Sequence, residues 1–290
     1  MKVSVIIPFR NLNPIVQESI ENAKKQGYKD TEVIAVSDRI KPEIPGVTGV
    51  YCPDCKGVGA KRNAGVKVSK GDILLFLDAD CMCLDNSIEQ LLQVFKDTRA
   101  DAVSGMPTAP KHGNLLGYIT GLEYEDRFIR MGEGWVSIAA TTCLGMKRDA
   151  FVKIGGFQDY TTGEATGEDW DFSAKFHKAG FKIFHTNKAR FVHEHGGDTF
   201  WKYLVRRYHH ARYRPTHAKV HKQTFEEYAT PSFVISSTLL LCIPQTIRIL
   251  MRNKDPRILL LPFLSIPRTI TWLLGVFMGY LEVKKGKSGD

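Results

Sequence analysis

Leu74-Leu75-Phe76-Leu77-Asp78-Ala79-Asp80 is the stretch of sequence that decides the fold. The apolar run, which begins at Ile73, is typical of a strand buried on both faces, as in a parallel sheet covered by helices. Ligands bind at the carboxyl ends of such strands, and here that end carries two carboxylates. Asp78 and Asp80 are two residues apart, so they can share a face and reach one hard cation such as Mg²⁺ or Mn²⁺. Asp is also common in solvated turns, and this pair alone does not establish a metal site.

The sequence before this run predicts a parallel sheet. Val3–Pro8 and Glu32–Val36 are short runs rich in β-branched residues, and a helix between them starts at Asn13-Pro14 and stops near Gly27. Strand, helix, strand is the unit from which parallel sheets are built. Further strands are predicted at 102–105, 138–146, 181–184 and 189–192, further helices at 60–68, 86–96, 148–154, 170–178 and 201–213, and a less regular stretch at 107–134.

A second group of acids opens the helix predicted at 170–178. The run Gly167–Phe172 contains Glu168, Asp169 and Asp171. Acids at a helix start suit the helix dipole, and Asp is a good N-cap. That explanation accounts well for one acid and poorly for three. A carboxylate in this position can serve as general base toward an acceptor hydroxyl.

Two further segments contain candidate ligands. His193, in Phe191–Gly196, follows a predicted strand and is either a metal ligand or a core histidine. The run Gly57–Gly65 places Lys61 and Arg62 after glycines at a helix start, where a diphosphate can bind. This run is not a dinucleotide fingerprint, because its third glycine is misplaced and no strand directly precedes it.

The cysteines do not form a convincing metal or redox motif. The spacing of Cys81 and Cys83 is tighter than structural zinc pairs prefer, so pairing them with Cys52 and Cys55 into a zinc site is disfavoured. Cys52 and Cys55 lie in a Pro-rich loop and not at a helix start, which disfavours a redox pair. The chain opens on a strand without a signal-peptide cleavage site, so we expect a reducing cytosolic environment and free thiols.

Composition restricts the class of protein. A hydrophobic fraction of 43% predicts a globular core, and 290 residues are enough for one large α/β domain with an appendage. The formal net charge of +9 favours an acidic partner, which includes nucleic acid, anionic lipid and phosphate-bearing substrates.

Beyond Thr230 the chain changes character. Pro231–Ile247 lacks charge, Arg248–Arg257 is basic, and Ile258–Leu281 is apolar but interrupted by Arg268. A spanning hairpin would put the basic loop on the far side, against the positive-inside tendency. We therefore expect helices that lie in the membrane interface, with a spanning hairpin and a cover for the soluble core as alternatives.

The ordered motifs together resemble family 2 of the inverting glycosyltransferases, which have the GT-A fold, and in particular a membrane-associated member. The similarity covers about residues 1–195. It rests on the following segments: Val3–Pro8, Val36–Asp38, Lys61–Gly65, Lys70–Asp72, Leu77–Asp80, Ile154–Phe157, Gly167–Phe172, Ala179–Ile183 and His193. The resemblance implies a Rossmann-like, mostly parallel sheet flanked by helices, a hexosyl-transferring enzyme and a nucleotide diphosphate sugar donor.

The resemblance also implies roles for particular residues. Asp169 is expected to be the catalytic base, supported by Glu168. Asp80, Asp78 and His193 are expected to hold Mn²⁺ or Mg²⁺. The expected nucleotide-sugar site comprises Pro8, Asn11, Asp38, Arg62, Asp78 and Asp80, with Asp38 on the base and Arg62 near the diphosphate.

Some residues depart from the family pattern. Leu12 follows Asn11 where members often carry Glu, and Ser37 stands where many carry a second Asp. Both lie in the expected nucleoside pocket, which leaves the base open. The Q-x-x-R-W signature of processive members is absent, which favours a single transfer per encounter.

On this basis the chain is divided into four parts. Residues 1–100 form the nucleotide-sugar-binding half of the α/β domain, 101–200 the acceptor and catalytic half, 201–230 a basic aromatic helix and 231–290 hydrophobic membrane-associated helices. The cations and aromatics of Trp201–Arg214 favour the cytoplasmic membrane surface and a lipid-linked or glycan acceptor. We expect no nucleic-acid partner, and a homo-oligomer stays open. The alternatives are a non-catalytic, nucleotide-sugar-binding adaptor at the membrane surface and, with less support, a sugar nucleotidyltransferase or a nucleic-acid binder.

Overall fold

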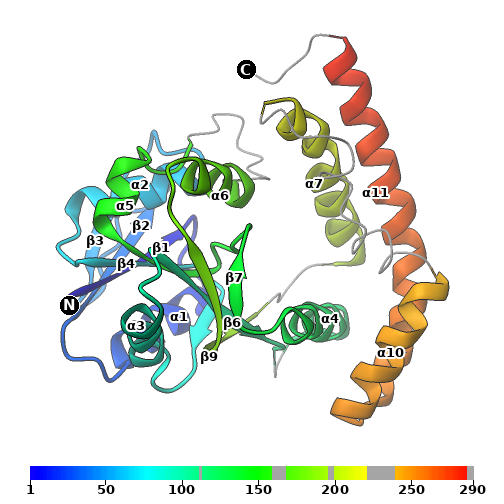
Figure 1. Ribbon diagram of the computed structural model, residues 1–290, viewed down its shortest axis with the longest axis horizontal. Helices are drawn as coiled ribbons and strands as arrows, with labels where there is room; N and C mark the ends of the chain where they lie inside the picture. The colour runs from blue at the N-terminus through cyan, green and yellow to red at the C-terminus, as the bar shows by residue number, and fades with distance from the viewer. Residues whose placement is uncertain (111–112, 159–167, 195–198, 221–238, 286–290) are drawn as a thin grey trace. The chain divides into compact units, whose positions relative to one another are not determined.

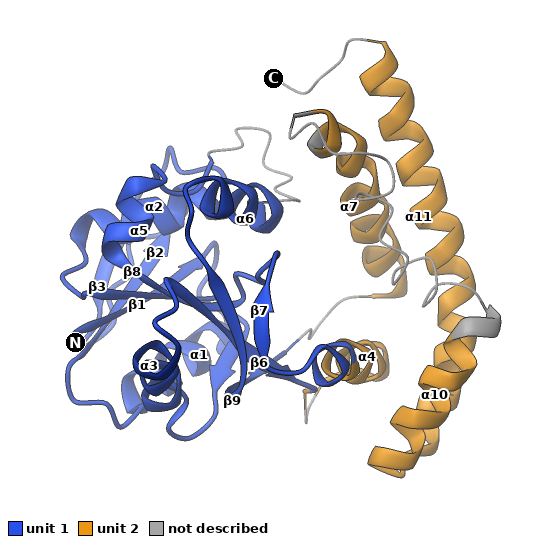
Figure 2. Cartoon of the chain, viewed as in Figure 1, with its two compact units in different colours: residues 1–109, 127–194 blue, residues 110–126, 195–290 orange. Residues whose placement is uncertain are grey.

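The computed structural model describes residues 1–110, 113–158, 168–194, 199–220 and 239–285. They form two compact units: unit 1 comprises residues 1–109 and 127–194, and unit 2 comprises 110–126 and 195–290 (Figure 2). Several predicted segments extend beyond the described residues, namely Gly167, 195–198, 221–230 of the basic helix and 231–238 of the first apolar segment.

Unit 1 is an α/β unit built on one sheet (Figure 1). Its strands are β1 (Val3–Phe9), β2 (Thr31–Ser37), β3 (Thr48–Tyr51), β4 (Ile73–Leu77), β5 (Cys81–Cys83), β6 (Ala102–Thr108), β7 (Gly134–Val136), β8 (Cys143–Lys147) and β9 (Ile183–His193). Its helices are α1 (Pro14–Lys25), α2 (Val58–Val68), α3 (Ser87–Thr98), α5 (Arg148–Lys153) and α6 (Glu168–Lys178), and α4 (Leu115–Met131) contributes residues to both units.

The sheet has the order β3-β2-β1-β4-β8-β6-β9-β5, with β7 on β9. The predicted strand–helix–strand unit is confirmed: β1 pairs in parallel with β2 and β4. The sheet is nevertheless mixed, because β8 runs antiparallel to both β4 and β6. The two strands predicted at 181–184 and 189–192 are one strand, β9, whose start pairs with β7 and whose end pairs with β5.

Helices cover both faces of the sheet, which explains the unbroken apolar runs. Along β4, Leu75 and Leu77 pack into the core beneath α1 and α3, and Leu74 and Phe76 pack into the core beneath α2, α5 and α6. Every residue of β1 and β4 is buried. The sequence pattern of a doubly covered strand is therefore confirmed.

Phe157 packs between α2, β4 and α6. Gly156, whose φ of +75° favours glycine, brings the chain against α2, where the Asn63 side chain donates to the Phe157 carbonyl at 2.9 Å and accepts from its N–H at 3.0 Å. The Phe157 ring lies 5.1 Å from the ring of Phe76 in β4 and 5.0 Å from that of Phe172 in α6. The loop thus fixes α6 to the strand that carries Asp78.

Unit 2 consists of α7 (Phe200–Val220), α10 (Leu239–Asn253), the short 3₁₀ helix η1 (Pro256–Leu260), α11 (Leu261–Lys284) and residues 110–126. α7 and α11 pack closely: a Cβ added at Gly275 would lie 2.5 Å from the Tyr208 carbonyl oxygen. In the described part of the chain, Pro256–Lys284 is the one helical stretch long and apolar enough to cross a bilayer, with mean hydropathy 1.5 and a third of its apolar window buried. By itself this is weak support for a membrane span.

Candidate active site

The carboxyl edge of the parallel strands gathers the predicted nucleotide-site residues. Pro8 lies near the end of β1, Asp38 follows β2, and Asp78 follows β4. Asp78 extends the pairing of β4 with β8, since its N–H donates to the Thr142 carbonyl at 3.0 Å. A turn follows, in which the Cys81 N–H donates to the Asp78 carbonyl at 3.0 Å. This turn places the side chain of Asp80, which is 45% exposed, at the surface of the edge.

Asp80 and His193 are brought together as the sequence predicts. β5 pairs with β9 so that Cys81 is opposite His193, and the Glu194 N–H donates to the Asp80 carbonyl at 2.8 Å. His193 Nε2 lies 3.4 Å from Asp80 Oδ1. Among the described residues, one group of three candidate ligands lies close enough to share an ion: Asp80, Cys81 and His193, with ligand atoms within 4.8 Å of one another.

Arg62 connects the two groups of acids. Its side chain is 1% exposed, and Nη2 donates to Asp78 Oδ1 at 2.7 Å. Nη1 lies 3.9 Å from Glu168 Oε1, and the guanidinium carbon lies 5.2 Å from the centre of the Phe157 ring. The Arg62 guanidinium, expected near a diphosphate, thus faces carboxylates from β4 and α6. Asp78, expected as a metal ligand, is paired with Arg62 and is absent from the group of Asp80, Cys81 and His193.

The acid pair at the start of α6 is strongly perturbed by burial. Burial, together with the charge of Asp169, raises the pKa of Glu168 to about 7. Burial also raises the pKa of Asp169, while Arg62 and the Thr141 hydroxyl oppose that rise. Thr141 Oγ1 donates a short hydrogen bond to Asp169 Oδ1. One buried cation therefore serves partly exposed carboxylates from two elements, an arrangement typical of functional sites.

Replacing Arg62 by Met should destabilise the fold by about 3–5 kcal/mol at pH 8, because the carboxylates of Asp78, Glu168 and Asp169 lose their cation. The loss should be smaller at pH 5. Glu168, with its pKa raised to about 7, is then protonated and no longer needs a positive partner. Urea unfolding at both pH values measures the difference.

The matched control for Arg62→Met is Lys147→Met, which breaks the exposed pair in which Lys147 Nζ lies 3.0 Å from Asp101. Such surface pairs contribute under about 1 kcal/mol. An equal loss of stability for Arg62→Met at pH 5 and pH 8 would show that lost packing, and not charge, explains the effect.

The expected nucleoside pocket contains a buried cation. Lys61 Nζ, on a side chain 5% exposed, lies 3.2 Å from Asp38 Oδ1. Arg10 Nε lies 3.9 Å from Asp38 Oδ2 on the other side. Ser37 has a structural contact in this region, since its hydroxyl donates to the Arg10 carbonyl and accepts from the N–H of Arg39. Asn11 is exposed in the bend after β1.

Sequence reasoning missed three neighbours of these groups. The sequence placed Lys61 at a basic helix start but did not predict its contact with Asp38. Cys81 is next to Asp80 in sequence, but only the pairing of β5 with β9 places it beside His193. Thr141 has no sequence signal, because its partner Asp169 is distant along the chain.

Comparison with known proteins identifies the family. The family model for glycosyl transferase family 2 matches residues 4–155, more than half of the chain. Glycosyltransferase GlyG of Streptococcus pneumoniae is 27% identical over 42% of this chain, and succinoglycan biosynthesis protein ExoM of Rhizobium meliloti is 29% identical over 55% of it. These matches span 45% and 52% of the two relatives, so the chain covers about half of their length.

The fold also matches a solved structure. The mannosyltransferase PcManGT from Pyrobaculum calidifontis, in complex with GDP-Man and Mn²⁺, gives a TM-score of 0.60 at 17% identity, covering 100% of this chain and 88% of that one. This likeness confirms the expected GT-A fold. Together with the match to the family model over β1–β8, it shows that the chain belongs to glycosyl transferase family 2.

Proposed function

We propose that this protein is an inverting, metal-dependent glycosyltransferase that moves a sugar from a nucleotide diphosphate sugar to an acceptor hydroxyl. The observation that carries the proposal is the pairing of two groups across Arg62: Asp78 at the nucleotide edge and the Glu168–Asp169 pair at the start of α6. A donor site and a catalytic base need this proximity, because the acceptor must attack the carbon that the diphosphate leaves.

The donor site is assigned to the edge that contains Asp38, Asp78 and Asp80. The neighbour PcManGT binds GDP-Man with Mn²⁺, which supports a divalent cation and a nucleotide sugar here. The Asp80 carboxylate and the His193 imidazole fit Mn²⁺, which accepts both oxygen and nitrogen ligands. Such a cation, when bound, neutralises charge on the leaving nucleoside diphosphate.

The catalytic base is assigned to Asp169. Thr141 donates to Oδ1, which orients the carboxylate that would accept the proton of the acceptor hydroxyl. The raised pKa of Asp169 makes it a stronger base than a solvated aspartate. Arg62 and Glu168 tune this charge. Attack from the side opposite the leaving group inverts the anomeric carbon.

The acceptor is proposed to be membrane-borne. α7 mixes cations and aromatics, which suits a surface of anionic headgroups and a lipid-linked or glycan acceptor at the cytoplasmic face. The missing Q-x-x-R-W signature supports a single transfer per encounter. Attachment is proposed through the C-terminal helices, either peripherally or by a hairpin.

A titration panel of nucleoside diphosphates and sugar nucleotides, with and without Mn²⁺, tests the proposed donor site. We expect one base to bind, with affinity that depends on the metal. Binding that is absent across the panel in a folded protein would reject the donor site. Tight binding without turnover for any acceptor would favour a non-catalytic adaptor.

Thr141→Val should move the acidic limb of the kcat/KM profile to higher pH. Losing a hydrogen bond to a charged group raises the pKa of Asp169 further, so kcat/KM on the acidic limb should fall roughly tenfold. Nucleoside diphosphate affinity should stay the same. Thr141→Ser keeps the hydroxyl and should restore the wild-type profile.

The neighbouring Thr142→Val is the control for Thr141→Val, since Thr142 uses its backbone carbonyl toward Asp78. A purely structural role for Thr141 would lower the activity of Thr141→Val equally at all pH values, without a shift of its acidic limb. Thr141→Ser would then restore only stability.

A further inference from the structure

Unit 2 exposes an apolar stripe along α10, η1 and α11. On α11 the exposed apolar side chains recur every three or four residues, and Phe263 and Phe277 are 71% and 57% exposed. On α10 they recur every four residues, and Met251 is 73% exposed. The stripe comprises Ile243, Ile247, Met251, Leu259, Leu260, Phe263, Ile266, Ile270, Leu273, Leu274, Phe277 and Met278.

The opposite side of α11 is rich in charge and packs against α7. Arg212 of α7 makes a two-pronged pair with Glu282, at 2.7–3.0 Å, and Arg214 lies over the Trp272 ring at 5.7 Å. Arg268, 4% exposed, pairs with Glu123. α7 and α11 therefore run side by side over these residues (Figure 1).

This packing excludes a simple transmembrane orientation of α11. Trp272 lies near the middle of the apolar stretch Pro256–Lys284, so a spanning α11 would carry Arg214 into the middle of the bilayer. The exposed Lys202, Arg206 and Lys219 of α7 lie on the same helix. Cations facing hydrocarbon are costly, whereas a helix in the membrane plane buries only its apolar stripe.

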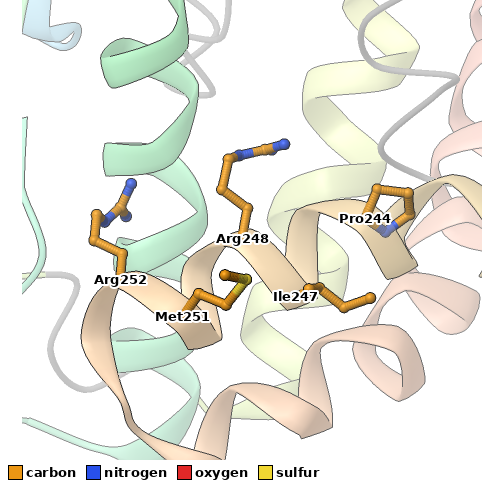
Figure 3. Close-up of a pocket in the computed structure, with 5 residues that line it drawn as sticks. All are labelled: Pro244, Ile247, Arg248, Met251 and Arg252. Atoms are coloured by element: carbon orange, nitrogen blue, oxygen red, sulfur yellow. The ribbon is translucent and has the colours of Figure 1, made fainter.

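Cations border the stripe at the ends of these helices. Arg248 and Arg252 lie in the open hollow on α10 together with Pro244, Ile247 and Met251 (Figure 3). Both pair with the one fully buried carboxylate of Asp126, so two cations share a single negative charge. Lys284 and Lys285 are exposed at the end of α11, whereas Arg257, 56% exposed at the start of η1, is paired with Asp255 at 2.6 Å. Such a border suits anionic headgroups.

We infer that α10, η1 and α11 form a membrane-binding face that lies in the plane of an anionic bilayer without crossing it. A second copy of the chain fits this face less well, because an isologous contact would bring the same bordering cations together. The inference rests on the proposed function only in giving a membrane-borne acceptor its location, and it stands or falls without any donor.

Vesicle binding by the full-length protein tests the face directly. We expect co-sedimentation with phosphatidylglycerol-containing vesicles, weaker binding to phosphatidylcholine alone, and release by alkaline carbonate. The double variant Phe263→Gln, Phe277→Gln should bind at least about tenfold more weakly, because each Phe loses its apolar burial. The control Val152→Gln, at a residue 65% exposed in unit 1, should bind as wild type.

A depth measurement separates the two orientations and does not depend on weakened binding. Single cysteines at positions 263 and 277, in a Cys52→Ser, Cys55→Ser background, carry a fluorophore that bromolipids quench. Fourteen residues of helix span about 21 Å, so equal depth at both positions supports the in-plane face, and a large depth difference overturns it.

Other results would also overturn the inference. Unchanged vesicle binding by the double variant rejects the stripe as the contact. A dimer in sedimentation velocity that this variant dissociates, without vesicle binding by wild type, assigns the face to a second copy. Nucleoside diphosphate affinity, measured on the same samples, reports the donor site separately, so failure of one proposal is distinguishable from failure of the other.

Discussion

Asp169→Asn should lower kcat by about 10²- to 10⁴-fold, the range that general base catalysis contributes. The amide keeps the shape of the side chain and still accepts from Thr141, but it takes no proton from the acceptor. Nucleoside diphosphate affinity should be unchanged, because the donor edge is built by β1, β2 and β4. Steady-state transfer kinetics and nucleotide titration on the same preparation measure the two quantities.

Asp171→Asn is the matched control for the base, since Asp171 is also an acid in the first turn of α6. Its charge interacts with the same helix dipole. A fall in kcat that is limited to Asp169→Asn therefore identifies a base, and not merely a favourable charge at a helix start. Equal losses of kcat in both variants, or substantial turnover by Asp169→Asn, would show that Asp169 is not the catalytic base.

Asp80→Ala should weaken the metal-dependent part of nucleoside diphosphate binding by at least about 100-fold, since losing only the groups that orient metal ligands already costs 10–100-fold. Affinity without metal should stay as in wild type. His193→Ala should show a loss in the same direction, because its Nε2 lies 3.4 Å from Asp80 Oδ1. Isothermal titration with and without Mn²⁺ gives both affinities.

Asp85→Ala is the control for Asp80→Ala: Asp85 has the same charge and is exposed just beyond β5. It should leave metal-dependent binding intact. Metal-dependent binding that persists in Asp80→Ala would move the ion to other residues, and Asp78, which is paired with Arg62, would be the first to examine.

Local patterns predicted the layered part of the fold well. The apolar runs of β1 and β4, both buried on two faces, and the capped helix at Asn13-Pro14 between β1 and β2 carry enough information for a parallel unit. α4 was missed because glycines 117 and 121 interrupt its pattern. β9 was predicted as two strands because a polar stretch, Thr186–Lys188, separates its apolar halves. Both halves pair with β6, and that pairing joins them in one strand.

Part of the candidate site was likewise predictable from local sequence, and part depends on contacts between distant segments. The sequence places Asp80 and His193 on their own strand ends, and the pairing of β5 with β9 brings them together. A basic residue at a helix start favours a surface position, so the burial of Arg62 was not predictable from its neighbours. Its partners come from β4 and α6, and only tertiary packing around Phe157 sets that contact.

The stereochemistry of one transfer reaction tests the central claim most directly. Wild-type protein is mixed with Mn²⁺, the sugar nucleotide whose nucleoside diphosphate binds, and a panel of soluble and detergent-solubilised lipid-phosphate acceptors. NMR follows release of nucleoside diphosphate and the anomeric coupling of the product. We predict release that needs both metal and acceptor, with inverted configuration. A product of retained configuration, or no release by a folded protein that binds the donor, would contradict the proposed mechanism.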